Sequence, residues 1–169
     1  EILERATRIF AEVNDLVTRA QTHQTPLAYP MTIGIIPTIA PFLLPKVLPL
    51  LRQQFPQFQL NVVEEQTERL LEKVRYGAID TAIIALPYNT DGLLSFEFWS
   101  ETFLAVFAKD SKHANLSSIN ADELANSNLM LLGEGHCLTD HALSVCHLDK
   151  SRVKQAFSEA SQDRFIQMA

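Results

Sequence analysis

Residues 59–85 read QLNVVEEQTERLLEKVRYGAIDTAIIA, and this stretch decides the fold. Its first apolar run, Gln59–Val63, has the composition of a strand, and its last run, Thr81–Ala85, has the same character. Between them, Thr67–Tyr76 has helical spacing, and Gly77 suits the end of a helix. The stretch therefore predicts a strand–helix–strand unit, in which the two strands are parallel.

The residues before this unit continue the alternation. We expect a strand at Thr32–Ile36 and a helix at Ile39–Phe55, although Pro49 should remove one backbone hydrogen bond of that helix. The order strand, helix, strand, helix, strand predicts an α/β fold with a parallel sheet and helices on both faces. We assign residues 31–86 to a first lobe.

Charge and composition limit the function. The 169 residues carry 14 Lys and Arg against 20 Asp and Glu, which gives a net charge of −6 and no basic face for a phosphate backbone. No apolar run is long enough to cross a bilayer and no signal peptide is visible, so we expect a cytoplasmic protein without membrane contact. The chain starts inside a helical pattern without an initiator methionine, and we expect a fragment.

The remaining regions flank the first lobe. Residues 1–21 predict a helix with two apolar stripes, which is typical of a dimerising or docking helix, although a helix packed on its own domain fits the pattern equally well. Residues 22–30 read as a polar connector, and residues 87–169 as a second lobe. In that lobe we expect strands at Phe103–Ala108, Leu129–Leu132 and Val153–Phe157, and helices at Ala121–Asn126, at Leu138–His147 and from Ser161.

The segment Gly133–Cys146 holds the only two cysteines, nine positions apart. Cys137 falls at a strand-to-helix turn beside His136, with Thr139 as the expected N-cap, and such a position lowers a thiol pKa. Cys146 falls on the apolar face of the helix. This asymmetry suggests a redox pair, and two ordinary reduced cysteines are the alternative. The spacing of histidines and cysteines does not suit zinc, so no metal is expected.

The predicted strand-to-helix junctions carry hydroxyl or thiol side chains. They are Thr38, Thr67, Cys137 with Thr139, and Ser161. Ligands of open α/β sheets bind beyond the carboxyl ends of the strands, so these side chains are candidates for ligand binding. No Arg or Lys lies at the junctions to hold a carboxylate, which favours a small neutral ligand. N-capping is the alternative role of each hydroxyl.

The run LLGEGHCLTDHALSVC, residues 131–146, resembles the redox segment of OxyR, the peroxide-sensing branch of the LysR-type transcriptional regulators. The resemblance extends over nearly the whole chain. It implies a two-lobed periplasmic-binding-protein-like effector domain, incomplete at its C-terminus and preceded by a linker helix. It also implies that hydrogen peroxide oxidises Cys137, that Cys146 becomes its disulfide partner, and that Thr38, Thr67 and His136 position the peroxide.

The same resemblance implies the partners. They are a second copy of the chain in a homodimer or homotetramer, DNA through a winged helix-turn-helix that this sequence lacks, RNA polymerase and a disulfide reductant, with no cofactor. We therefore expect a regulatory domain and not an enzyme, in an activator of oxidative-stress genes. The alternatives are a LysR-type effector domain that senses a small metabolite, with incidental cysteines, and a thiol peroxidase.

Overall fold

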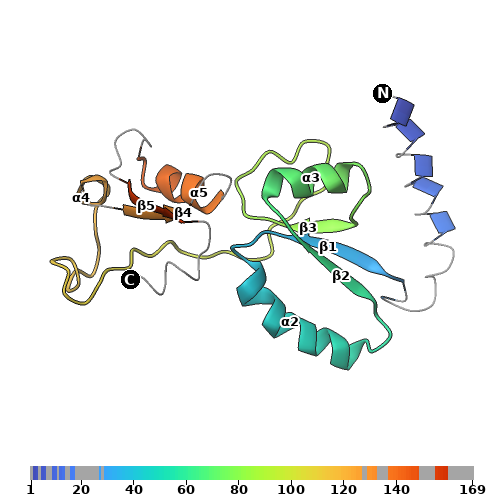
Figure 1. Ribbon diagram of the computed structural model, residues 1–169, viewed down its shortest axis with the longest axis horizontal. Helices are drawn as coiled ribbons and strands as arrows, with labels where there is room; N and C mark the ends of the chain where they lie inside the picture. Colours follow the sequence, from blue (N-terminus) through green and yellow to red (C-terminus); the bar gives the residue numbers. More distant parts are fainter. Residues whose placement is uncertain are drawn as a thin grey trace. The chain divides into compact units, whose positions relative to one another are not determined.

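The computed structural model (Figure 1) describes Leu27, residues 29–126, 129–132, 137–148 and 155–159, and ten helical residues between 2 and 17. The chain divides into two compact units, Glu1–Ser95 and Phe96–Ala169. Each unit has a sheet of its own.

A three-stranded sheet forms the centre of the first unit. Its middle strand, β1 (Met31–Ile35), pairs in parallel with β2 (Leu60–Glu64) on one side and with β3 (Thr81–Ile83) on the other. The parallel α/β sheet predicted from residues 31–85 is confirmed.

Two helices cover this sheet. α2 (Ala40–Gln54) connects β1 to β2, and α3 (Thr67–Arg75) connects β2 to β3. Because β2 and β3 flank β1 on opposite sides, crossovers of the usual right hand place the two helices on opposite faces, as Figure 1 shows. The buried apolar side chains of this unit are Ile35, Ile36, Ala40, Leu70, Leu71 and Ile79.

α2 is continuous through Pro45 and Pro49. Pro41, Pro45 and Pro49 are all exposed, and their spacing of four places them on one stripe of the helix. A proline nitrogen cannot bond the carbonyl four residues earlier, and the carbonyls left free here belong to Pro41 and Pro45. Since these carbonyls lie on the solvent side, water can satisfy them. The helix predicted at residues 39–55 is therefore confirmed despite its prolines.

The second unit contains shorter elements. They are α4 (Ala121–Ala125), β4 (Leu129–Leu132), α5 (Cys137–Val145) and β5 (Gln155–Glu159). β4 has the predicted bounds and pairs in parallel with β5, with an irregularity between Leu129 and Met130. The first two residues of the strand expected at Val153–Phe157, and the helix expected from Ser161, lie outside the described residues.

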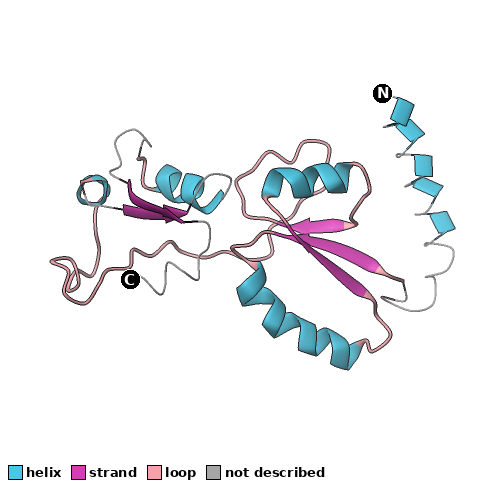
Figure 2. Cartoon of the chain, in the orientation of Figure 1, coloured by secondary structure: helices cyan, strands magenta, loops and turns pink. Residues whose placement is uncertain are grey.

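The strand predicted at Phe103–Ala108 is wrong. Figure 2 draws the chain between β3 and α4 as loop, and the predicted strand lies inside that loop. A strand exists only where a neighbour completes its hydrogen bonds, and an apolar run such as residues 103–108 does not show that a neighbour is present. Within the described residues no strand pairs with this segment. Its large apolar side chains, with those just before it, remain exposed: Leu94, Phe96, Phe98, Trp99, Phe103, Leu104 and Val106.

The N-terminal segment is helical at every described position between residues 2 and 17, in agreement with the helix predicted there. Its large apolar side chains are exposed: Ile2, Leu3, Ile9, Phe10, Val13, Leu16 and Val17. Most of the connector predicted at residues 22–30 lies outside the described part. Among the helices that the structure describes, none has both the length and the hydropathy required to span a bilayer.

Candidate functional site

Thr38 and Thr67 lie at the same edge of the first unit's sheet. In the register of β1 and β2, Ile35 pairs with Glu64, and each threonine follows its paired residue by three positions. The ladder extends one residue further, because the backbone N–H of Glu65 donates to the carbonyl of Ile35 at 3.3 Å. The carboxyl ends of two neighbouring parallel strands thus carry the two threonines, which is where ligands of such sheets bind.

Neither threonine occupies an N-cap position. The N-cap residue is Ile39 in α2 and Gln66 in α3, and neither helix has a side-chain capping hydrogen bond. Thr38 lies in the turn before α2, and Thr67 is the first residue of α3, with 3% of its surface exposed. N-capping, the alternative that the sequence left open for these two hydroxyls, is therefore excluded.

The segment that contains Cys137 begins α5. Because α5 starts at Cys137, Thr139 lies inside the first helical turn, and the prediction that Thr139 is the N-cap is wrong. A cap residue contributes only about 1 kcal/mol, so the two residues before Thr139 can adopt helical backbone at little cost. His136 and the side chain of Cys137 lie outside the described residues.

Cys146 directly follows α5 and is a free, half-buried cysteine. Its backbone N–H donates to the carbonyl of Ala142 at 3.1 Å, so the helical hydrogen bonding continues through this residue. Nine helical steps of about 1.5 Å place the two cysteine Cα atoms about 13 Å apart along the axis. A disulfide requires less than about 7 Å, so α5 separates the two cysteines too far for a bond.

The candidate residues thus fall into two groups. Thr38 and Thr67 belong to the first unit, and Cys137, Thr139 and Cys146 belong to the second. Within the first unit the strand register brings the two threonines to one edge. Within the second, a single helix carries the two cysteines at its opposite ends.

The structure contains an ion pair close to Thr67 in the sequence that was not predicted. Lys73 Nζ donates to Glu65 Oε1 at 2.5 Å. Glu65 lies before α3 and Lys73 near its C-terminal end, so the pair has none of the three- or four-residue spacings that mark ion pairs along one helix. The only signal in the sequence was an acidic residue directly before the Gln66–Thr67 junction.

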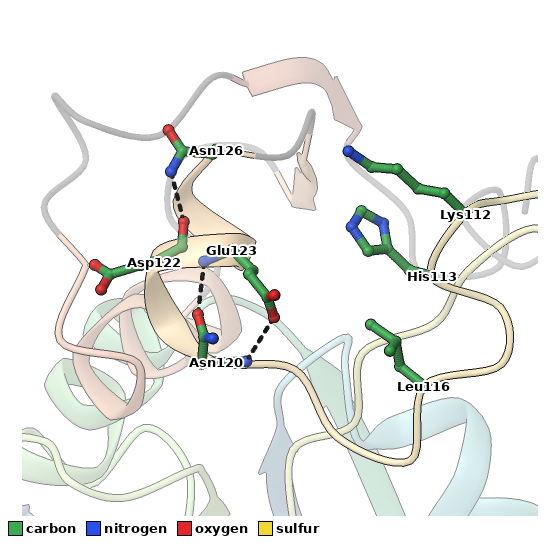
Figure 3. Close-up of a pocket in the computed structure, with 7 residues that line it drawn as sticks. All are labelled: Lys112, His113, Leu116, Asn120, Asp122, Glu123 and Asn126. Atoms are coloured by element: carbon green, nitrogen blue, oxygen red, sulfur yellow. Dashed lines mark hydrogen bonds between the residues drawn. The ribbon is translucent and has the colours of Figure 1, made fainter.

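A cavity of about 550 Å³ lies in the second unit and contains none of the predicted site residues. One wall consists of Lys112, His113 and Leu116 from a loop, and the other of α4 with its N-cap (Figure 3). Its polar groups largely serve α4 itself. Asn120 Oδ1 accepts from the Glu123 N–H at 2.8 Å, the Glu123 carboxylate accepts from the Asn120 N–H, and Asn126 Nδ2 donates to the carbonyl of Asp122 at 2.9 Å. These hydrogen bonds stabilise the ends of α4, so we do not assign the cavity as a ligand site.

In the part of the chain that the structure describes, no group of three or more His, Cys, Asp or Glu side chains could hold a metal ion.

Known proteins resemble the chain closely enough to assign its family. A probable hydrogen peroxide-inducible genes activator of Mycobacterium avium is 40% identical over 162 residues, which cover 95% of this chain and 52% of that protein. The HTH-type transcriptional regulator EstR of Acinetobacter baylyi is 35% identical over 168 residues, or 99% of this chain and 56% of EstR. The chain thus spans about half the length of the curated relatives it matches.

Solved structures agree. A full-length OxyR variant from Pseudomonas aeruginosa has a TM-score of 0.78 to this chain at 30% identity, and the match covers 99% of this chain and 53% of that one. The family described as LysR substrate binding domain matches residues 24–169. Since that match covers both units, the chain belongs to the LysR family of transcriptional regulators and contains its substrate binding domain.

Proposed function

We propose that the chain is the peroxide-sensing regulatory domain of an OxyR-like transcription factor. The observation that carries this proposal is the position of Cys137 and Cys146 at opposite ends of one short helix, with Cys146 free. These two cysteines can form a disulfide only if α5 unwinds in part, so their oxidation would change the conformation of the domain. The names of two similar proteins, a hydrogen peroxide-inducible genes activator and an OxyR, support the same function.

The chemistry proceeds in two balanced steps. The Cys137 thiolate attacks one peroxide oxygen, the S–O bond forms as the O–O bond breaks, and the departing hydroxide takes a proton and becomes water. The Cys146 thiolate then attacks the sulfenic sulfur of Cys137, which forms the disulfide and releases a second water. Two thiols lose two electrons in total, and one peroxide is reduced. A helix N-terminus favours the thiolate at Cys137.

The second step requires α5 to unwind at one end at least. A helix of nine residues has little intrinsic stability, so opening it costs on the order of a few kcal/mol, which the disulfide can offset. Unwinding would also expose Leu143, whose side chain is buried in α5. The released apolar side chains would pack against another surface, and the spacing of attached DNA-binding domains would change.

Thr38, Thr67, His136 and Thr139 would orient the peroxide. Hydrogen peroxide is small and neutral and both donates and accepts hydrogen bonds, as a threonine hydroxyl does. Both threonines lie at the carboxyl edge of the sheet, where ligands of such sheets bind. Thr67 is almost fully buried, so a ligand that reached it would be enclosed.

The remaining partners follow from the proposed function. The exposed apolar stripe of the N-terminal helix would pair with a second copy in a dimer or tetramer, and a winged helix-turn-helix elsewhere in the protein would bind DNA. In the cytoplasm, the oxidised form would contact RNA polymerase and activate oxidative-stress genes until a disulfide reductant restored the thiols.

One titration separates this function from its alternatives. Reduced protein is mixed with hydrogen peroxide while free thiols and consumed peroxide are counted. A sensor loses two thiols for one peroxide and then stops, whereas a thiol peroxidase supplied with a reductant continues to consume peroxide. A metabolite-binding domain keeps both thiols. In a Cys146→Ser variant, dimedone should label Cys137 as sulfenic acid, and folded protein without that label would refute the proposal.

A further inference from the structure

The ion pair between Glu65 and Lys73 joins the two ends of a short segment that contains Thr67. Glu65 is the second residue before Thr67, and Lys73 lies two helical turns further along α3. The Nζ–Oε1 distance is 2.5 Å, and the two side chains are 28% and 37% exposed for Glu65 and Lys73. The pair is therefore part-buried.

Main-chain hydrogen bonds hold the residues on both sides of Thr67. The Glu65 N–H donates to the carbonyl of Ile35 at 3.3 Å, which attaches it to β1. The Leu70 N–H donates to the carbonyl of Gln66 at 3.1 Å, which forms the first turn of α3. Leu70, with no exposed surface, anchors the helix in the core. These bonds hold the backbone before and after Thr67, and the ion pair joins Glu65 to a later turn of α3.

The Glu65 carboxylate depends on this one cation. Its second oxygen, Oε2, is buried and has no hydrogen-bond partner within the described structure. Without Lys73, a carboxylate with one buried oxygen would have to turn toward water, because unpaired charge is costly in a protein interior. Turning the Glu65 side chain would change the surroundings of the segment that leads into Thr67, two residues further along the chain.

We propose that Glu65 and Lys73 are positioning residues that hold the Thr67 hydroxyl at the carboxyl edge of the sheet, a role that rests on the proposed peroxide-sensing function. The fold itself does not need the pair, since α3 is held by buried Leu70 and Leu71, and part-exposed ion pairs add little stability. The pair affects the position of the Thr67 hydroxyl. A small change in that position alters the reaction rate far more than it alters the stability of the fold.

The test compares Lys73→Met with Lys73→Arg in the full protein, and uses Lys46→Met as the matched control. Lys46 is exposed on the other helix of the same unit, and among the described residues it has no ion pair. Lys73→Met should slow oxidation of Cys137 by peroxide about tenfold and leave its reaction with a neutral alkylating agent within about twofold. Lys73→Arg should restore most of the rate, and Lys46→Met should change neither reaction.

A double-mutant cycle identifies Thr67 as the residue through which the pair acts. In a Thr67→Val background, Lys73→Met should slow oxidation no further. Full additivity, equal slowing of oxidation and alkylation, or no rescue by Lys73→Arg would each overturn the positioning role.

A spectroscopic measurement keeps the two proposals distinguishable. The amide and methyl NMR signals of Thr67 should shift in Lys73→Met, return in Lys73→Arg and stay unchanged in Lys46→Met. If peroxide fails to oxidise Cys137 in the unmodified protein, peroxide sensing is refuted, and these signals still decide the positioning role. Unshifted Thr67 signals in Lys73→Met would overturn it.

Discussion

Two hydrogen bonds join Asp80 to Thr32, 48 residues away in the sequence. The Asp80 carboxylate accepts a hydrogen bond from the Thr32 backbone N–H at 2.6 Å, and the Asp80 N–H donates to the Thr32 carbonyl at 3.0 Å. Asp80 directly precedes β3, and Thr32 lies in β1. The carboxylate therefore takes the place of a strand carbonyl where β3 is too short to supply one.

Asp80→Ala should lower the free energy of unfolding by about 1 kcal/mol, because it removes an acceptor from the Thr32 N–H at an exposed edge where water partly replaces it. Asp80→Asn keeps an acceptor oxygen and should lose less. Urea denaturation measures both, through a lower midpoint with an unchanged slope. Two variants as stable as the unmodified protein would show that this bond contributes nothing.

Gly34→Ala should destabilise the first unit by about 1–3 kcal/mol through overpacking. A Cβ atom at Gly34 would lie 2.6 Å from Leu70 Cδ2 and 2.8 Å from Ile79 Cδ1, both well inside van der Waals contact. Adding Ile79→Val removes Cδ1, so the double variant should lose less than the sum of the single losses. Strict additivity in thermal unfolding would contradict the clash.

Thr67→Val should slow oxidation of Cys137 by peroxide while leaving alkylation of the same thiol nearly unchanged, because a hydroxyl that orients the oxidant is lost and the thiolate is not. Valine has the same shape, so the buried site keeps its packing, and any loss of stability should be about 1 kcal/mol. Stopped-flow oxidation and alkylation of one preparation give both rates. Equal slowing of both would locate the effect in thiol acidity or folding.

Disulfide formation should change amide hydrogen exchange across residues 133–150. The helical hydrogen bond from the Cys146 N–H to Ala142 cannot persist while the sulfurs approach each other over a gap of about 13 Å, so its protection should fall on oxidation. The Cys146→Ser variant treated with peroxide is the control, since it is oxidised but cannot form the bond. Unchanged protection with a proven Cys137–Cys146 disulfide would rule out the helix switch.

Features with a local cause were predictable from the sequence. The bounds Leu129–Leu132 of β4 were predicted because this apolar run lies directly between a polar residue and a glycine. The start of α3 at Thr67 followed in the same way from helical spacing and from the polar residues before it.

Features that depend on a distant partner were not predictable. Phe103–Ala108 is a continuous apolar run of strand length, but no pattern within a segment shows whether a neighbouring strand will lie beside it. The Glu65–Lys73 pair joins a strand end to a helix end, and the Asp80–Thr32 bond joins residues 48 apart. The N-cap assigned to Thr139 failed for another reason, because capping preferences are too weak to fix a boundary within two residues.

The central position of β1 has a consequence for synthesis on the ribosome. β1 is translated before both of its neighbours, so the nascent chain carries this apolar strand with two open edges until residues 60–64 emerge. β2 can then close one edge, and the other stays open until Asp80 and β3 leave the exit tunnel. Open strand edges invite pairing with other chains, so the nascent protein is most exposed to aggregation before β2 emerges, and one open edge remains until β3 follows.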